Sequence, residues 1–144
     1  MRFFAVIDTN VIVSSLLSPH PDSATVLIRK YILDGTVVPL FNDEILSEYR
    51  SVLARPKLGI PENLATQIVN TITQTGSALE RTATRETFSD PKDIVFYEVA
   101  LSKDDAYLVT GNTRHFPQNT IVVSPAEMIA IIEGTLEFSP GHKQ

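Results

Sequence analysis

The chain has 144 residues, of which 43% are hydrophobic and 20% charged, a composition typical of one globular domain and not of a disordered chain. It contains no cysteine, which excludes disulfide scaffolds, thiolate metal sites and cysteine nucleophiles. The net charge of −5 is opposite in sign to that of a general polyanion-binding protein. No apolar run is long enough for a signal peptide or a membrane span, so we expect a soluble cytoplasmic protein without membrane contact.

Short apolar runs alternate with segments of helical periodicity, which is typical of a parallel sheet covered by helices on both faces. Strands are predicted at residues 3–7, 37–40, 78–82, 106–110 and 120–123. Helices are predicted from 23 to 33, from Asn42 to about Ala54, from Pro61 to Gly76, from Asp90 to about Leu101 and after Ser124. Residues 14–22 are rich in turn formers and are expected to lead into the first of these helices. We expect one domain at 1–134 and a C-terminal tail without a clear pattern at 135–144.

Three of the predicted helices begin with capping signals. Asn42 is suited to accept a hydrogen bond from the first turn of the helix that follows it. Asp90 precedes Pro91, a residue favoured at the first helical position. Residues 124–127, Ser-Pro-Ala-Glu, have the form of a capping box. These signals place the helix starts more firmly than hydrophobic periodicity alone.

The edge of the sheet at which an acid is expected separates candidate site residues from the other acids. In open parallel sheets, ligands bind outside the carboxyl ends of the strands. Asp8 directly follows the first predicted strand and is itself followed by Thr9 and Asn10. Asp104 and Asp105 precede a strand, belong to the opposite edge and are discounted for chemistry. Asp8 is therefore a candidate site residue, with a simple Asx-turn to Asn10 as the structural alternative.

Two later segments reach the same edge. Asp90 and Asp93 stand at the start of a helix, and Asn112 comes just after the strand that ends at Thr110. With Asp90 as the N-cap, Asp93 occupies the third helical position, where an acid also stabilises a helix through its dipole. Asp90 is accordingly interpreted as the cap. Asp93 is a candidate site residue, with helix stabilisation as the competing role.

The helix after Asn42 supplies one more candidate. Glu48 lies at the edge of its apolar stripe, whereas Glu44 points further outward and suits the first turn of the helix. Several carboxylates at one edge repel each other and favour a hard divalent cation such as Mg²⁺ or Mn²⁺. Such a cation activates water and binds phosphate, which would allow a negatively charged protein to bind RNA. The cations considered for steering the RNA backbone are Arg50, Arg55, Lys57, Lys92 and Arg114.

Four short motifs carry a resemblance to a known family. They are VIDTNV at 6–11, EILSEY at 44–49, DPKD at 90–93 and YLVTGN at 107–112, the last followed by His-Phe-Pro at 115–117. In this order and at these spacings they resemble the PIN-domain ribonucleases, specifically the VapC-like toxins of bacterial and archaeal toxin–antitoxin systems. The resemblance extends from about residue 2 to residue 132. His115 itself is interpreted as structural.

The resemblance implies an α/β fold, a three-layer α/β/α sandwich with a five-stranded parallel sheet. It also implies Mg²⁺- or Mn²⁺-dependent hydrolysis of single-stranded or loop RNA. Asp8, Glu48 and Asp93 match the catalytic, metal-binding acids of the family. Asn112 stands where many relatives have a fourth acid, a departure that bears on the second metal site. Residues with supporting roles would be Thr9, Asn10, Asp90, Thr110 and Asn112. A homodimer held by a small cognate antitoxin protein is implied as well.

Two alternatives to an endoribonuclease remain at this point. A degenerate PIN module would bind RNA or a protein partner without cleaving, and Asn112 is the feature that favours it. An Asp-based phosphotransfer domain would use Asp8 as the phosphoryl acceptor. Phosphatases of that kind carry a second acid at the position of Asn10, and receiver domains carry acids where this chain has Val6 and Ile7. The sequence therefore favours the nuclease.

Overall fold

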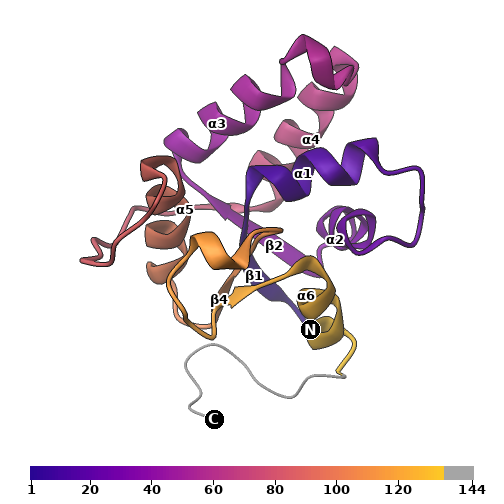
Figure 1. Ribbon diagram of the computed structural model, residues 1–144. Helices are drawn as coiled ribbons and strands as arrows, with labels where there is room; N and C mark the ends of the chain where they lie inside the picture. Colours follow the sequence, from indigo (N-terminus) through magenta and orange to yellow (C-terminus); the bar gives the residue numbers. More distant parts are fainter. Residues whose placement is uncertain (135–144) are drawn as a thin grey trace.

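The computed structural model describes residues 1–134, so the predicted tail at 135–144 lies outside the described residues. Five parallel strands form one sheet in the order β3-β2-β1-β4-β5 (Figure 1). The strands are β1 Phe3–Ile7, β2 Val37–Phe41, β3 Ser77–Ala78, β4 Ala106–Val109 and β5 Val122–Val123. In the register, Phe4 of β1 pairs with Val38 on one side and with Ala106 on the other. The predicted α/β/α sandwich with a five-stranded parallel sheet is confirmed.

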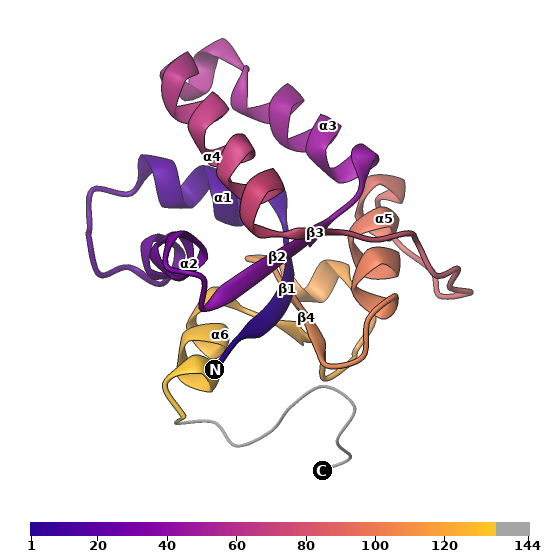
Figure 2. The ribbon, with the colours of Figure 1, turned by 180° about the vertical axis from the view of Figure 1, so that it is seen from behind.

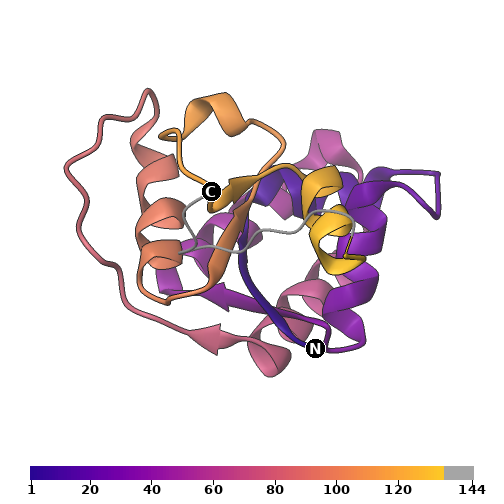
Figure 3. The same ribbon diagram turned by 90° about the horizontal axis from the view of Figure 1, so that it is seen from below.

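Six α-helices connect and cover the strands. They are α1 Thr9–Leu17, α2 Ala24–Leu33, α3 Asp43–Leu53, α4 Glu62–Thr75, α5 Pro91–Leu101 and α6 Pro125–Ile132. Viewed along the sheet, α5 covers one face and α2 with α6 covers the other (Figure 3). From behind, α4 runs down into the short edge strand β3 (Figure 2). No helix within residues 1–134 is long and apolar enough to cross a membrane.

The predicted capping residues begin their helices as expected. The Asn42 side chain accepts a hydrogen bond from the Ile45 N–H (2.9 Å), and Asp90 accepts one from the Lys92 N–H (2.9 Å). Ser124 and Glu127 form both hydrogen bonds of the capping box at the start of α6. These three helix starts were predictable because each cap bonds only to its own first turn.

The prediction was wrong at α1 and at β3. Residues 14–22 were expected to form turns, but α1 extends from Thr9 to Leu17. Its sequence is rich in β-branched residues of low helix propensity, and it is stabilised by burial of Val11 and Ile12 in the core. The strand expected at 78–82 is only Ser77–Ala78. The Leu79 N–H still donates to the Phe41 carbonyl of β2 (2.8 Å), and after it the backbone turns to α5, where the Thr82 N–H donates to the Glu98 carbonyl (3.0 Å).

The carboxyl end of β1, at the centre of the sheet, is hydrogen-bonded to β4 and to α3. On one side, the Asp8 N–H donates to the Val109 carbonyl of β4 (2.9 Å). On the other, the buried Tyr49 hydroxyl of α3 donates to the Ile7 carbonyl. The strand order reverses at β1, and such a switch point is where open α/β sheets bind ligands. Tyr49 therefore holds α3 next to that position.

Removal of the Tyr49 hydroxyl should weaken the fold. Tyr49→Phe deletes a fully buried hydrogen bond to β1, and we expect a loss of about 1–2 kcal/mol in the free energy of unfolding, measured by urea denaturation. Tyr31→Phe, on the half-buried face of α2, is the control and should change the free energy by less than about 0.5 kcal/mol. Equal effects of the two substitutions would contradict a role for the Tyr49 hydroxyl in holding α3.

Candidate functional site

Asp8 lies at the switch point and is only 8% exposed. It is the N-cap of α1, and its carboxylate accepts hydrogen bonds from the Thr9 N–H (2.8 Å) and from the Thr110 hydroxyl (2.7 Å). The alternative Asx-turn between Asp8 and Asn10 does not form. Instead, the Asn10 side-chain oxygen accepts a hydrogen bond from the Gly111 N–H (3.2 Å). The ends of β1 and β4 are thus joined twice, and the Asp8 carboxylate has a fixed position.

Glu48 and Asp93 reach the same edge of the sheet from two helices. Glu48 is half-buried on α3, next to the anchoring residue Tyr49. Asp93 is half-buried in the first turn of α5, whose cap is Asp90. Neither Glu48 nor Asp93 has a hydrogen-bond partner for its carboxylate within residues 1–134. Asp90 therefore supplies the capping bond, and the Asp93 side chain takes no part in it.

The carboxylates influence one another electrostatically. Burial raises the pKa of Asp8, while hydrogen bonds from Thr110 and Thr9 lower it. The negative charge of Glu48 raises this pKa further, and the positive charge of His115 lowers it. Glu48 therefore lies close enough to Asp8 to oppose its ionisation. The hydrogen bonds favour the charged form of Asp8 against both effects.

Asp93 is the more strongly perturbed acid. Burial, followed by the negative charges of Asp8 and Asp90, raises the pKa of Asp93 to about 6. Glu48 contributes a further increase, and His115 opposes it. Asp93 accepts no hydrogen bond within residues 1–134 that would favour its ionised form, so the charge of His115 offsets the repulsion only in part and the pKa stays raised. The structure thus brings the three sequence-predicted acids together as one interacting cluster. We call Asp8, Glu48 and Asp93 the acidic cluster.

The supporting residues lie around this cluster in different ways. Thr110 is fully buried and also accepts a hydrogen bond from the Asn112 N–H (3.0 Å). Asn112 itself is exposed and precedes a short 3-10 turn, Thr113–His115. The Thr9 hydroxyl is buried without a hydrogen-bond partner among the described residues. His115 is exposed and acts on two acids of the cluster, so it belongs to the site's electrostatics, which the sequence did not indicate.

The donor chemistry of the acidic cluster fits a hard divalent cation. Its members are carboxylates, the ligands that Mg²⁺ and Mn²⁺ prefer, and their mutual repulsion is what a cation relieves. Burial raises the pKa values of Asp8 and Asp93, and the repulsion from neighbouring carboxylates raises them further. Within residues 1–134, no three His, Asp or Glu side chains are arranged as a closed set of metal ligands. Glu48 and Asp93 would have to turn toward Asp8 to form one.

A set of three charged side chains that links α3 and α5 was not predicted from the sequence. Arg81, in the irregular connection between β3 and α5, bridges Glu44 of α3 and Glu98 of α5. Glu98 is 8% exposed, and the positions on either side of it in α5 are buried as well. An acid inside such a buried stretch requires a partner. The apolar residues around Glu98 therefore indicated that this acid needs a partner, but they did not indicate that the partner is Arg81.

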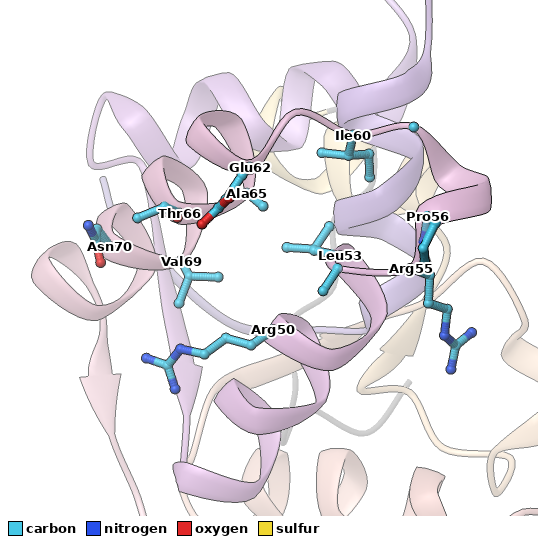
Figure 4. A pocket seen from close by; sticks show the side chains of 12 residues that line it. Arg50, Leu53, Arg55, Pro56, Ile60, Glu62, Ala65, Thr66, Val69 and Asn70 are labelled. Carbon is cyan, nitrogen blue, oxygen red and sulfur yellow. The ribbon is translucent and has the colours of Figure 1, made fainter.

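A cleft of about 360 Å³ lies between α3 and α4 (Figure 4). Leu53 and Val69 face each other across it, and Arg50 and Arg55 contribute to its lining. Arg50 follows Glu48 by two residues, which places the two side chains about 200° apart around α3. The cleft and the cluster therefore occupy different sides of α3, and Arg50 is directed away from the acids.

The raised pKa of Asp93 gives a test of the cluster. Because its pKa of about 6 in the folded protein lies above the ordinary value of 3.8, ionisation of Asp93 opposes folding above pH 6. This penalty disappears as the pH falls toward 3.8. Asp93→Asn should therefore unfold at a higher urea concentration than the parent protein at neutral pH, and the difference should vanish at the acidic end of this range.

Carbon-13 NMR of the aspartate carboxyls measures the same property directly. The Asp93 signal should titrate near pH 6 without added metal, and Asp8→Asn should lower that midpoint by removing a repelling charge. Asp104→Asn, on the opposite edge of the sheet, is the control and should leave the midpoint unchanged. A midpoint close to 3.8 in the parent protein would show that Asp93 does not share a site with Asp8.

Comparison with known families identifies the domain. A family model described as PIN domain (PIN_3) matches residues 5–114, which include all three acids of the cluster. Searches of curated proteins and of solved structures find no match. PIN domains are generally nucleases, and the match therefore suggests a ribonuclease role. The matched segment begins within β1, ends after β4 and covers most of the chain, and the chain belongs to the PIN domain family.

Proposed function

We propose that the chain is a Mg²⁺- or Mn²⁺-dependent endoribonuclease in which Asp8, Glu48 and Asp93 are the catalytic and metal-binding acids. The observation that carries this proposal is the buried Asp8 carboxylate, held by Thr9 and Thr110 at the switch point of the sheet and within electrostatic reach of Glu48 and Asp93. Burial and like-charge repulsion cost stability, so such a cluster is typical of a functional site. Membership of the PIN domain family supports hydrolysis of RNA as the reaction.

The residues of the cluster differ in how firmly they are held. Hydrogen bonds from Thr9 and Thr110 fix the Asp8 carboxylate, which provides a constant point of attachment. Glu48 and Asp93 have no such bonds within residues 1–134 and are able to turn toward a ligand. The cation, when bound, activates a water molecule and neutralises charge on the phosphate. His115 adds a positively charged neighbour at the same edge when it is protonated.

We further propose that the protein is the VapC-like toxin of a toxin–antitoxin pair. This rests on the four motifs of the sequence and on the family match. In this proposal residues 1–134 are one domain, the partners are the RNA substrate, a cognate antitoxin protein and a second copy of the chain, and the location is the cytoplasm. The antitoxin would keep the nuclease inactive until it is removed.

One observation favours a second candidate, a PIN module that binds without cleaving. Asn112 is exposed at the end of β4 and carries no charge, so this position does not contribute a carboxylate to the site. An amide contributes less to cation affinity than a carboxylate. Phosphotransfer has no comparable support, because the side chain of Asn10 is bonded to Gly111 and position 10 supplies no second acid.

Cleavage of a mixed pool of structured RNA tests the nuclease. We expect cutting with Mg²⁺ or Mn²⁺, none with EDTA, and a loss of about 100-fold or more in rate for Asp8→Asn, Glu48→Gln and Asp93→Asn. Asp93→Asn preserves the shape of the first turn of α5 and so separates catalysis from helix stabilisation. Asp104→Asn is the matched control and should cut at the parent rate. Binding of Mn²⁺ without any cutting would instead support the module that binds without cleaving.

Growth measurements test the toxin. Expression of the parent protein should inhibit growth of a bacterial host, and Asp8→Asn should relieve the inhibition, since it removes the charge at the centre of the cluster. Protein levels of both forms are compared by immunoblot as the control. Equal toxicity of the two forms at equal levels would contradict toxicity through the nuclease site.

A further inference from the structure

The irregular connection at residues 79–90 is tied closely to α5. The Thr84 N–H donates to the Glu98 carboxylate (2.8 Å), and the Thr82 N–H donates to the Glu98 carbonyl (3.0 Å). Further along, the Phe88 ring packs edge-on against Tyr97, with ring centroids 5.5 Å apart. The backbone of the connection is therefore held in a defined position beside α5, and so is the Cα atom of each side chain that it carries.

From this fixed backbone position, the Arg81 side chain links two helices. Its Nε donates to Glu98 of α5 (2.7 Å), and its Nη1 lies 3.0 Å from both carboxylate oxygens of Glu44 on α3. Glu98 is almost fully buried, whereas the Glu44 side chain is 58% exposed. An exposed ion pair such as that with Glu44 adds little stability by itself. Its consequence is geometric, because one planar guanidinium fixes the distance between two carboxylates.

Both linked helices carry an acid of the cluster. Glu48 lies one turn beyond Glu44 on the same face of α3. Asp93 precedes Glu98 by five residues on α5, a rise of about 7.5 Å. Apart from Arg81, the rings of Tyr49 and Phe96 join these helices, with centroids 6.3 Å apart. A change in the separation of α3 and α5 would therefore change the separation of Glu48 and Asp93.

We propose that Arg81 is a positioning residue of the acidic cluster, which sets the separation of Glu48 and Asp93 by bridging Glu44 and Glu98. This proposal rests on the proposed function, since it assumes that the cluster binds a divalent cation. Arg81 itself does not contact substrate or cation. It acts by holding α3 and α5 at the spacing from which both acids reach one ion.

The test measures Mn²⁺ affinity by calorimetry, thermal stability and RNA cleavage on the same full-length proteins. Arg81→Met should weaken Mn²⁺ binding and cleavage by about 10-fold, the usual effect of losing a residue that orients metal ligands. Arg81→Lys should restore part of the affinity, because an ammonium reaches one carboxylate but cannot bridge two in a plane. Arg85→Met removes an exposed charge from the same connection and should change neither property.

A double variant separates positioning from stability. Arg81→Met alone leaves the Glu98 carboxylate buried without its cation and should lower the melting temperature. Arg81→Met with Glu98→Gln removes that buried charge, so the melting temperature should recover while Mn²⁺ affinity stays about 10-fold low, because the bridge to α3 is still absent. Recovery of affinity together with stability would overturn the proposal and make Arg81 a structural residue only.

The remaining outcomes distinguish this proposal from the function on which it rests. Parent protein that binds Mn²⁺ and cuts RNA, with Arg81→Met behaving identically, would overturn the role of Arg81 and leave the nuclease intact. Parent protein that neither binds Mn²⁺ nor cuts RNA would overturn the proposed function, and the positioning role with it.

Discussion

The hydrogen bond from the Thr110 hydroxyl to the Asp8 carboxylate is the interaction on which the site depends. It joins the carboxyl ends of β1 and β4, where the strand order of the sheet reverses. The same carboxylate caps α1, so its position is determined from the sheet and from the helix at once. Two such hydrogen bonds offset part of the cost of burying a carboxylate. This arrangement gives the acidic cluster one rigid member.

The other members of the cluster are held by their helices and not by bonds to their carboxylates. Tyr49 anchors α3 to the end of β1, and Arg81 links α3 to α5. Burial, followed by the negative charges of Asp8 and Asp90, raises the pKa of Asp93 to about 6, and no hydrogen bond within residues 1–134 offsets this increase. A rigid Asp8 beside two adjustable acids is an arrangement suited to closing around a cation, because only short side-chain movements are needed.

Much of the fold was predictable from local signals. The caps Asn42, Asp90 and Ser124 bond within one helical turn, and buried parallel strands appear as continuous apolar runs. The helix α1 was not predicted because its β-branched sequence has low helix propensity. It is stabilised by burial against the core and by the Asp8 cap. The bridging role of Arg81 was not predicted because its two partners lie 37 and 17 residues away in sequence, and no local pattern connects them.

The sequence by itself determined the order along the chain of the strands and of every helix except α1. It also determined the starts of the capped helices and the expectation that Asp8, Glu48 and Asp93 share one edge of the sheet. Each of these follows from interactions within a few residues or from the geometry of parallel sheets. Only the tertiary structure decided that Asp8 is fixed by Thr110 and that Arg81 bridges α3 and α5. These contacts join segments far apart in the chain, and their partners are brought together by packing of the core and not by any local preference of the backbone.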